Sequence, residues 1–174
     1  MSDNQITIQP EESYKIIRNS VLTAQSKVYT AVNSAMVQAY WEIGQEIHKA
    51  CGENDRAEYG KKLLEYLSEH LTKEFGKGFT VANLKNMRQF YRTFPNRQTL
   101  SSELSWSHYN LLMRIEDEKV RQFYADECVK SNWSVRQLKR QINSFYYERL
   151  LASQDKEAIK NEIELPEKIG RAHV

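Results

Sequence analysis

The stretch FGKGFTVANLKNMRQFYRTFPNR, residues 75–97, holds a helix boundary and the helix around which the fold is predicted to form. Two glycines, Gly76 and Gly78, end the preceding helical pattern, and Thr80 is then placed to cap a new helix. After the cap, apolar side chains recur at helical spacing, at Val81, Leu84, Met87 and Tyr91. This spacing predicts a helix that starts at Thr80, ends near Pro95 and buries one face.

Further helices are predicted on both sides of this stretch. Upstream, apolar residues spaced alternately by four and three indicate one long amphipathic helix over residues 13–50, and a second helix covers residues 59–75. Downstream, helices are predicted over residues 108–115, 117–130 and 134–152. The chain has only 6 Gly and 3 Pro, which disfavours many short strands. The predicted class is all-α: a long N-terminal helix, then a helix-turn-helix-like pair and further helices in one compact domain.

The two ends of the chain are predicted to lie outside this domain. Residues 1–12 are polar and are expected to be a disordered tail, the helical domain covers residues 13–152, and residues 153–168 are expected to be a linker. The last six residues, IGRAHV (169–174), read as the in-frame translation of a common sequencing-adapter sequence and are expected to be non-native. We therefore expect that this chain is a truncated fragment and that the natural protein continues into a C-terminal domain.

The composition excludes several kinds of site and location. No apolar run approaches the roughly 18 residues of a membrane span, and the N-terminus lacks a signal-peptide pattern, so we expect a cytoplasmic protein without a membrane partner. Cys51 and Cys128 are far apart and lack the spacing of a metal site or a disulfide framework. Ser105, Ser107 and His108 are close in sequence, but a serine just before a helical histidine is more often a cap. No catalytic residue, metal ligand or cofactor is therefore predicted for this chain.

Positive charge is segregated into two parts of a chain whose net charge is only +2. Residues 75–102 contain five basic residues and no acidic one, and residues 128–147 contain four basic residues and again no acid. The segregation indicates two basic surfaces and not a random scatter of lysine and arginine.

Helical geometry places many of these polar and basic side chains on outward faces. At 100° per residue, the apolar residues of the helix after Thr80 face the core, while Lys85, Asn86, Gln89 and Arg92 lie opposite. Cationic side chains suit phosphates, and amides and guanidinium groups suit base edges. The predicted DNA-binding residues are Lys77, Thr80, Asn83, Lys85, Asn86, Arg88, Gln89, Arg92, Arg97, Arg136, Lys139 and Arg140.

Two other interpretations stay open at this point. A helix surface that bears Lys and Arg is commonly just solvated, and any helix pair with a short turn imitates a helix-turn-helix motif. The long N-terminal helix could instead make the chain a protein-interaction or dimerisation scaffold, because Ala24, Ala31 and Ala35 form a small apolar seam that suits close helix packing. The basic segments would then face an acidic protein surface.

Several segments together resemble a known family. They are YWEIGQEI (40–47), YGKKLLEYLSEHL (59–71), FGKGFTVANLKNMRQFY (75–91), LSWSHYNLLMRI (104–115), RQFYADEC (121–128) and WSVRQLKRQINSFYYERLL (133–151). In this order, and without large gaps over residues 13–152, they are similar to the N-terminal domain of the YhcG-like proteins. Those are bacterial proteins whose second half resembles a PD-(D/E)xK nuclease.

The resemblance implies a helical domain that acts in DNA binding or target selection for a nuclease half. It implies no catalytic residue for this chain, and no nuclease-like half follows residue 151. We therefore expect a non-catalytic module, with Mg²⁺ needed only by the missing nuclease domain of a full-length metal-dependent enzyme.

Overall fold

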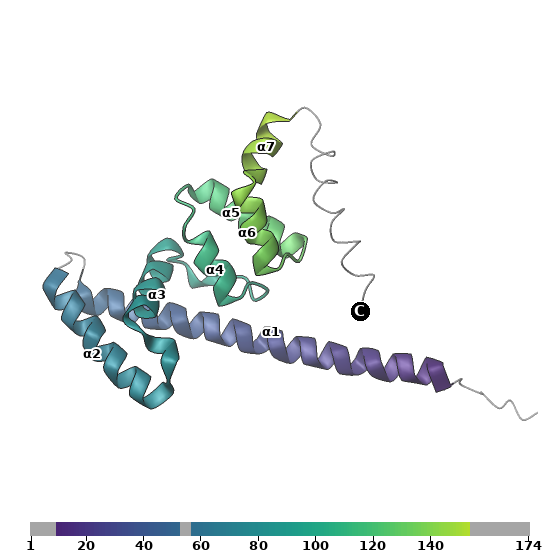
Figure 1. Cartoon of the computed structure of the whole chain (residues 1–174), viewed down its shortest axis with the longest axis horizontal. Helices are drawn as coiled ribbons and strands as arrows, with labels where there is room; N and C mark the ends of the chain where they lie inside the picture. Colours follow the sequence, from purple (N-terminus) through teal and green to yellow (C-terminus); the bar gives the residue numbers. More distant parts are fainter. Residues whose placement is uncertain (1–9, 53–56, 154–174) are drawn as a thin grey trace, which may run out of the picture. The chain divides into compact units, whose positions relative to one another are not determined.

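The computed structural model describes residues 10–52 and 57–153, and every regular element in these ranges is helical. The first helix, α1 (Pro10–Cys51), has 42 residues and is the long N-terminal helix that the sequence predicts (Figure 1). It is followed by α2 (Ala57–Phe75), a 3-10 turn η1 (Lys77–Phe79) and α3 (Val81–Thr93). The chain continues through a second 3-10 turn η2 (Arg97–Thr99), α4 (Trp106–Leu112), α5 (Glu118–Lys130), α6 (Val135–Asn143) and α7 (Tyr146–Ala152). The predicted all-α class is confirmed.

Backbone contacts divide the helical region into two compact units, one ending at Trp106 and the other starting at Ser107. In the first unit, α3 packs on the C-terminal half of α1 and also contacts α2 (Figure 1). Its core joins α1 to α2 and α3 through the buried residues Ile47, Cys51, Leu64, Leu84 and Met87. Each helix contributes one apolar face, as its sequence pattern predicts.

Aromatic side chains extend this core toward the end of α3. The Trp41 Nε1 atom donates a hydrogen bond to the Phe94 carbonyl oxygen over 2.7 Å. Phe90 is fully buried, and its ring centroid lies 5.3 Å from that of Trp106. The hydrogen bond holds the C-terminal end of α3 against α1, and the ring contact joins α3 to the first residue of α4.

The second unit is built around buried aromatic residues of α4 to α7. Tyr109, Tyr124, Trp133 and Tyr146 are all at most 5% exposed. The Tyr124 hydroxyl donates to the carbonyl oxygen of Gln141 over 3.3 Å and accepts from the Tyr147 amide over 3.2 Å. One phenol therefore joins α5 to both α6 and α7.

Capping residues in the local sequence set the first residues of three helices. Thr80 caps α3 by accepting from the Asn83 amide, and Asp117 caps α5 by accepting from Lys119 and Val120 amides. Ser134 caps α6 in a capping box, in which the Gln137 side chain in turn accepts from the Ser134 amide over 2.6 Å. The predicted starts at Thr80, Asp117 and Ser134 are confirmed.

The structure corrects three expectations. The single helix predicted over residues 134–152 is two helices, because Phe145 adopts a left-handed conformation (φ 53°) between α6 and α7. Phe145 is consequently 66% exposed instead of facing inward, and Tyr146 is buried in its place. Residues 10–12 belong to the first turn of α1 and not to a disordered tail. The rest of the predicted tail, the linker from residue 154 and the segment 169–174 lie outside the described residues.

Candidate nucleic-acid interface

The outward face of α3 carries the side chains predicted to recognise DNA. Leu84 and Met87 are buried, whereas Lys85, Asn86 and Arg92 are exposed. The division between the two faces is the one that helical spacing predicts, because the buried face is the side that packs on α1 and α2. The solvent side of α3 is therefore polar and basic.

Four of these residues come together in one hollow beside α2. Lys85, Arg88, Gln89 and Arg92 line a cavity of about 230 Å³, and Leu64 of α2 completes the lining. No carboxylate is among the residues that line it. Within the described ranges, neither Lys85 nor Arg92 takes part in a salt bridge. The hollow therefore presents the positive charges of Lys85 and Arg92 to solvent.

Gln89 and two other predicted residues are already used in local hydrogen bonds. The Thr80 hydroxyl caps α3, and the Asn83 side-chain amide donates to the Gly78 carbonyl oxygen over 3.0 Å. The Gln89 side-chain amide donates to the Thr93 hydroxyl over 3.1 Å. Thr80 and Asn83 thus set the entry of α3, while the exposed Gln89 bond can be exchanged for a ligand at small cost.

Arg97 differs from the other predicted cations because it is bound to α1. Its guanidinium group donates to a Glu42 carboxylate oxygen over 2.6 Å and to the Gln38 side-chain oxygen over 2.9 Å. Its positive charge is therefore largely compensated by Glu42, which makes Arg97 a weaker phosphate ligand than Lys85 or Arg92. Lys77 lies exposed in η1, before the start of α3.

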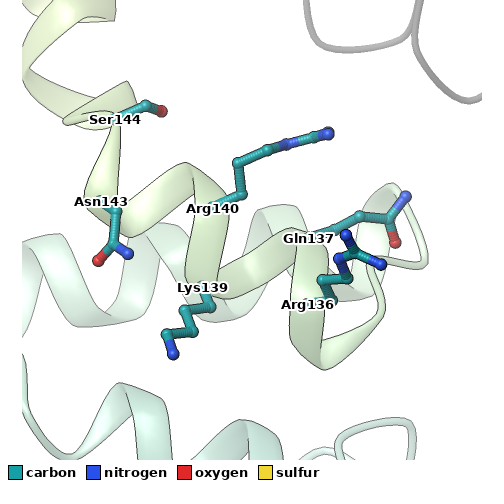
Figure 2. Close-up of a pocket in the computed structure, with 6 residues that line it drawn as sticks. All are labelled: Arg136, Gln137, Lys139, Arg140, Asn143 and Ser144. Carbon is teal, nitrogen blue, oxygen red and sulfur yellow. The ribbon is translucent and has the colours of Figure 1, made fainter.

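The second basic surface lies on α6, in the other unit. Arg136, Lys139 and Arg140 are exposed, and together with Asn143 they line a hollow on this helix. Figure 2 shows Lys139 and Asn143 projecting to one side of α6 and Arg140 to the other. These polar and basic side chains thus lie on two sides of α6. A helix that offers several hydrogen-bond donors in this way suits contact with a phosphate backbone.

Four residues that line these hollows, Asn143 among them, are not among the predicted DNA-binding residues. Leu64 belongs to the hollow beside α3, and Gln137 and Ser144 belong to the one on α6. Leu64 is buried in the core of the first unit, and nothing in the sequence shows that it also borders a polar surface. Gln137 belongs to a capping box, a pattern that predicts the start of a helix but gives no information on ligand binding.

Titratable groups with shifted pKa values lie in the core of the second unit. Burial lowers the pKa of His108 from its usual 6.5, and its Nε2 hydrogen bond to the Trp133 carbonyl oxygen opposes the shift. Burial also raises the pKa of Cys128 to about 12 and raises that of Tyr124. Burial is the largest cause of each of these shifts.

No group of three or more His, Cys, Asp and Glu side chains within residues 10–52 and 57–153 could hold a metal ion. In the same ranges, every helix is too short or too polar to cross a membrane.

Comparison with known proteins confirms the resemblance seen in the sequence. Residues 16–149 match the family described as the DUF1016 N-terminal domain. The chain is 34% identical, over an alignment of 170 residues, to the protein of Escherichia coli (strain K12) named "Putative nuclease YhcG". That match covers 79% of this chain and 45% of the relative, so the chain spans about half the length of this curated protein. No solved structure matches the chain significantly.

Proposed function

The chain belongs to the DUF1016 N-terminal domain family, and we propose that it is a DNA-binding or target-selecting module of a nuclease-like protein. The hollow beside α3 is the observation that carries the proposal. Lys85, Arg88 and Arg92 line it without any carboxylate, and Gln89 adds an amide. Cationic donors gathered in one hollow suit contact with a phosphate backbone.

The chemistry of the hollow also allows base contacts. Arg92 has a planar group of donors that matches acceptor pairs on a guanine edge, and Gln89 has the donor and acceptor that an adenine edge requires. Asn86 is exposed on the same helix and adds a second amide. The α3 surface would therefore both hold the backbone and discriminate between sequences, and the α6 surface, which has the same number of cations, would add further phosphate contacts.

We propose that DNA cleavage is carried out by a part of the protein that this chain does not contain. The curated relative is named a nuclease, and the chain spans 45% of its length. We propose that the remaining part supplies the metal-dependent cleavage, with Mg²⁺ bound there, and that this helical domain only brings DNA to it. The proposed location is the bacterial cytoplasm, where such a substrate is found.

Fluorescence anisotropy of residues 1–168 with labelled duplex, branched and single-stranded DNA tests the proposal. Between about 50 and 200 mM salt, five to eight phosphate contacts predict a log–log slope of roughly −4 to −7 on duplex. The same samples incubated with Mg²⁺ should show no strand cleavage. Lack of binding at the lowest salt would contradict DNA recognition, and cleavage by this chain would contradict a non-catalytic module.

A further inference from the structure

The N-terminal half of α1 exposes a large apolar surface. Nine large apolar side chains between residues 14 and 36 are 40% to 70% exposed: Tyr14, Ile16, Ile17, Val21, Leu22, Val28, Tyr29, Val32 and Met36. In Figure 1 this half of α1 extends beyond α2 and α3, which pack on the other half. Together these side chains expose on the order of several hundred Å², which is the size at which an apolar patch on a protein marks a contact surface.

Part of this surface follows a strict seven-residue repeat. Tyr14, Val21, Val28 and Ala35 are spaced by seven, and Ile17, Ala24 and Ala31 lie three residues after the first three of them. We call these seven residues the α1 seam; all of them are exposed. An isolated α-helix has 3.6 residues per turn, so a repeat of 3.5 forms one continuous stripe only when two helices wrap around each other. The repeat therefore indicates a helical partner with the same period.

The α1 seam is not part of the core of the first unit. The buried residues of α1 are Val37, Trp41, Gly44, Ile47 and Cys51. At 100° per residue, they lie on average roughly 180° around the helix from the seam. Beyond Ala35 the seam positions become polar, at Gln38, Glu42 and Lys49. The stripe is thus confined to the part of α1 that α2 and α3 leave uncovered.

The charges beside the seam permit pairing with a second copy of the same helix. In a parallel pair, the residue just before each seam repeat lies next to a residue of the partner helix whose number is five higher. This would bring Ser13 next to Arg18, Ser20 next to Gln25 and Lys27 next to Val32. No two like charges meet, so self-pairing encounters none of the repulsion by which charged flanks exclude a partner. Valine at two of the four core positions spaced by seven also favours two strands.

We propose that residues 14–35 of α1 pair with the same residues of a second copy as a parallel two-stranded coiled coil. The paired segment would be about 32 Å long. The interaction goes beyond DNA binding, because it uses a face of α1 that carries none of the proposed DNA ligands. It would give each assembly two copies of the basic α3 surface.

Molecular mass in solution, measured by sedimentation equilibrium on the whole chain without DNA, tests the pairing. We expect twice the 20.5 kDa of one chain at micromolar concentration. Val21→Glu with Val28→Glu places like charges in the seam and should weaken association at least about tenfold, or about 1.4 kcal/mol. The matched control, Asn19→Glu with Ser26→Glu, adds the same charge on the opposite, exposed side of α1 and should leave the mass unchanged.

Cysteine crosslinking tests the parallel orientation independently. Val21→Cys alone should form an intermolecular disulfide on mild oxidation, because an in-register parallel pair brings residue 21 against its copy. The native Cys51 and Cys128 are only 7% and 2% exposed and should not compete. A monomer across the concentration range, a dimer that resists the Val21 and Val28 substitutions, or crosslinking only between Val21→Cys and Val28→Cys chains would each overturn the proposal.

Discussion

Gly44 of α1 and Met87 of α3 are in direct backbone contact: a β-carbon built on Gly44 would lie only 2.0 Å from the Met87 carbonyl oxygen. The two helices of the first unit therefore cross where α1 has no side chain. Because a backbone oxygen cannot move aside as a flexible side chain can, any larger residue at position 44 must push α3 away. This close approach is what places the basic face of α3 relative to α1 and α2.

Gly44→Ala should destabilise the first unit by about 1–3 kcal/mol, the range for overpacking a core. Urea denaturation followed by circular dichroism measures the change. The matched control is Gly60→Ala in α2, where the new β-carbon would meet only the Cys51 sulfur at 3.5 Å. Replacing this helical glycine should instead stabilise by up to about 1 kcal/mol. Equal effects of the two substitutions would contradict the contact between α1 and α3.

Phe145→Gly should leave the second unit as stable as before or stabilise it by up to about 1 kcal/mol. Phe145 has φ 53° and is 66% exposed, so its side chain contributes little burial while its backbone is in a region that glycine adopts without strain. Thermal or urea unfolding checks this. Replacement of the next residue, Tyr146→Gly, removes a buried ring and should lower the free energy of unfolding by several kcal/mol. A large loss with Phe145→Gly would show that the break between α6 and α7 is held by that side chain.

The stability of the second unit should fall as the pH drops below about 6.5. Burial lowers the pKa of His108, so the folded state holds its neutral imidazole while the unfolded chain takes up a proton. The stabilisation is therefore complete above the usual histidine pKa and is lost as the pH falls from that value through the lowered pKa of the folded state. Urea unfolding at pH 7.5 and pH 5.0 measures the difference. His108→Gln should reduce this pH dependence, whereas His70→Gln, at an exposed position on α2, should not; the reverse pattern would contradict the assignment.

Arg97→Ala should weaken DNA binding less than Arg92→Ala does. Arg97 already pairs with Glu42 and Gln38 of α1, so removing it deletes a largely compensated charge. Arg92 lines the hollow beside α3 and has no salt bridge within the described residues. Anisotropy titrations of the two variants at one salt concentration provide the comparison. A larger loss with Arg97→Ala would mean that the pair with Glu42 opens to bind DNA.

Features set by neighbouring residues could be predicted from the sequence. Thr80, Asp117 and Ser134 are caps in the structure because a cap depends only on the residue and the amides two or three positions on. Lys85 and Arg92 face solvent because the spacing of Leu84 and Met87 determines the buried side of one helix. The basic face of α3 is therefore a consequence of local pattern.

Features that depend on contacts between residues far apart in the sequence could not be predicted. Gly44 occurs in a segment that the sequence marks as helical, but its contact with Met87 joins residues far apart in the chain. Glu42 and Arg97 are 55 residues apart, so their ion pair has no local signal. The turn at Phe145 could not be predicted because apolar residues continue through it at helical spacing, and a left-handed backbone at a phenylalanine has no signal in the local sequence.

The most direct test of the central claim is the DNA affinity of the Lys85→Ala, Arg92→Ala double variant, measured by fluorescence anisotropy at fixed salt. The matched control is Lys49→Ala with Lys62→Ala, which removes the same charge from exposed lysines that pair with Glu46 and Glu58. If the face of α3 binds DNA, the first variant should bind at least about tenfold more weakly than the control, with unchanged helicity. Equal affinity of the two variants would contradict the assignment of α3 as the DNA-binding surface.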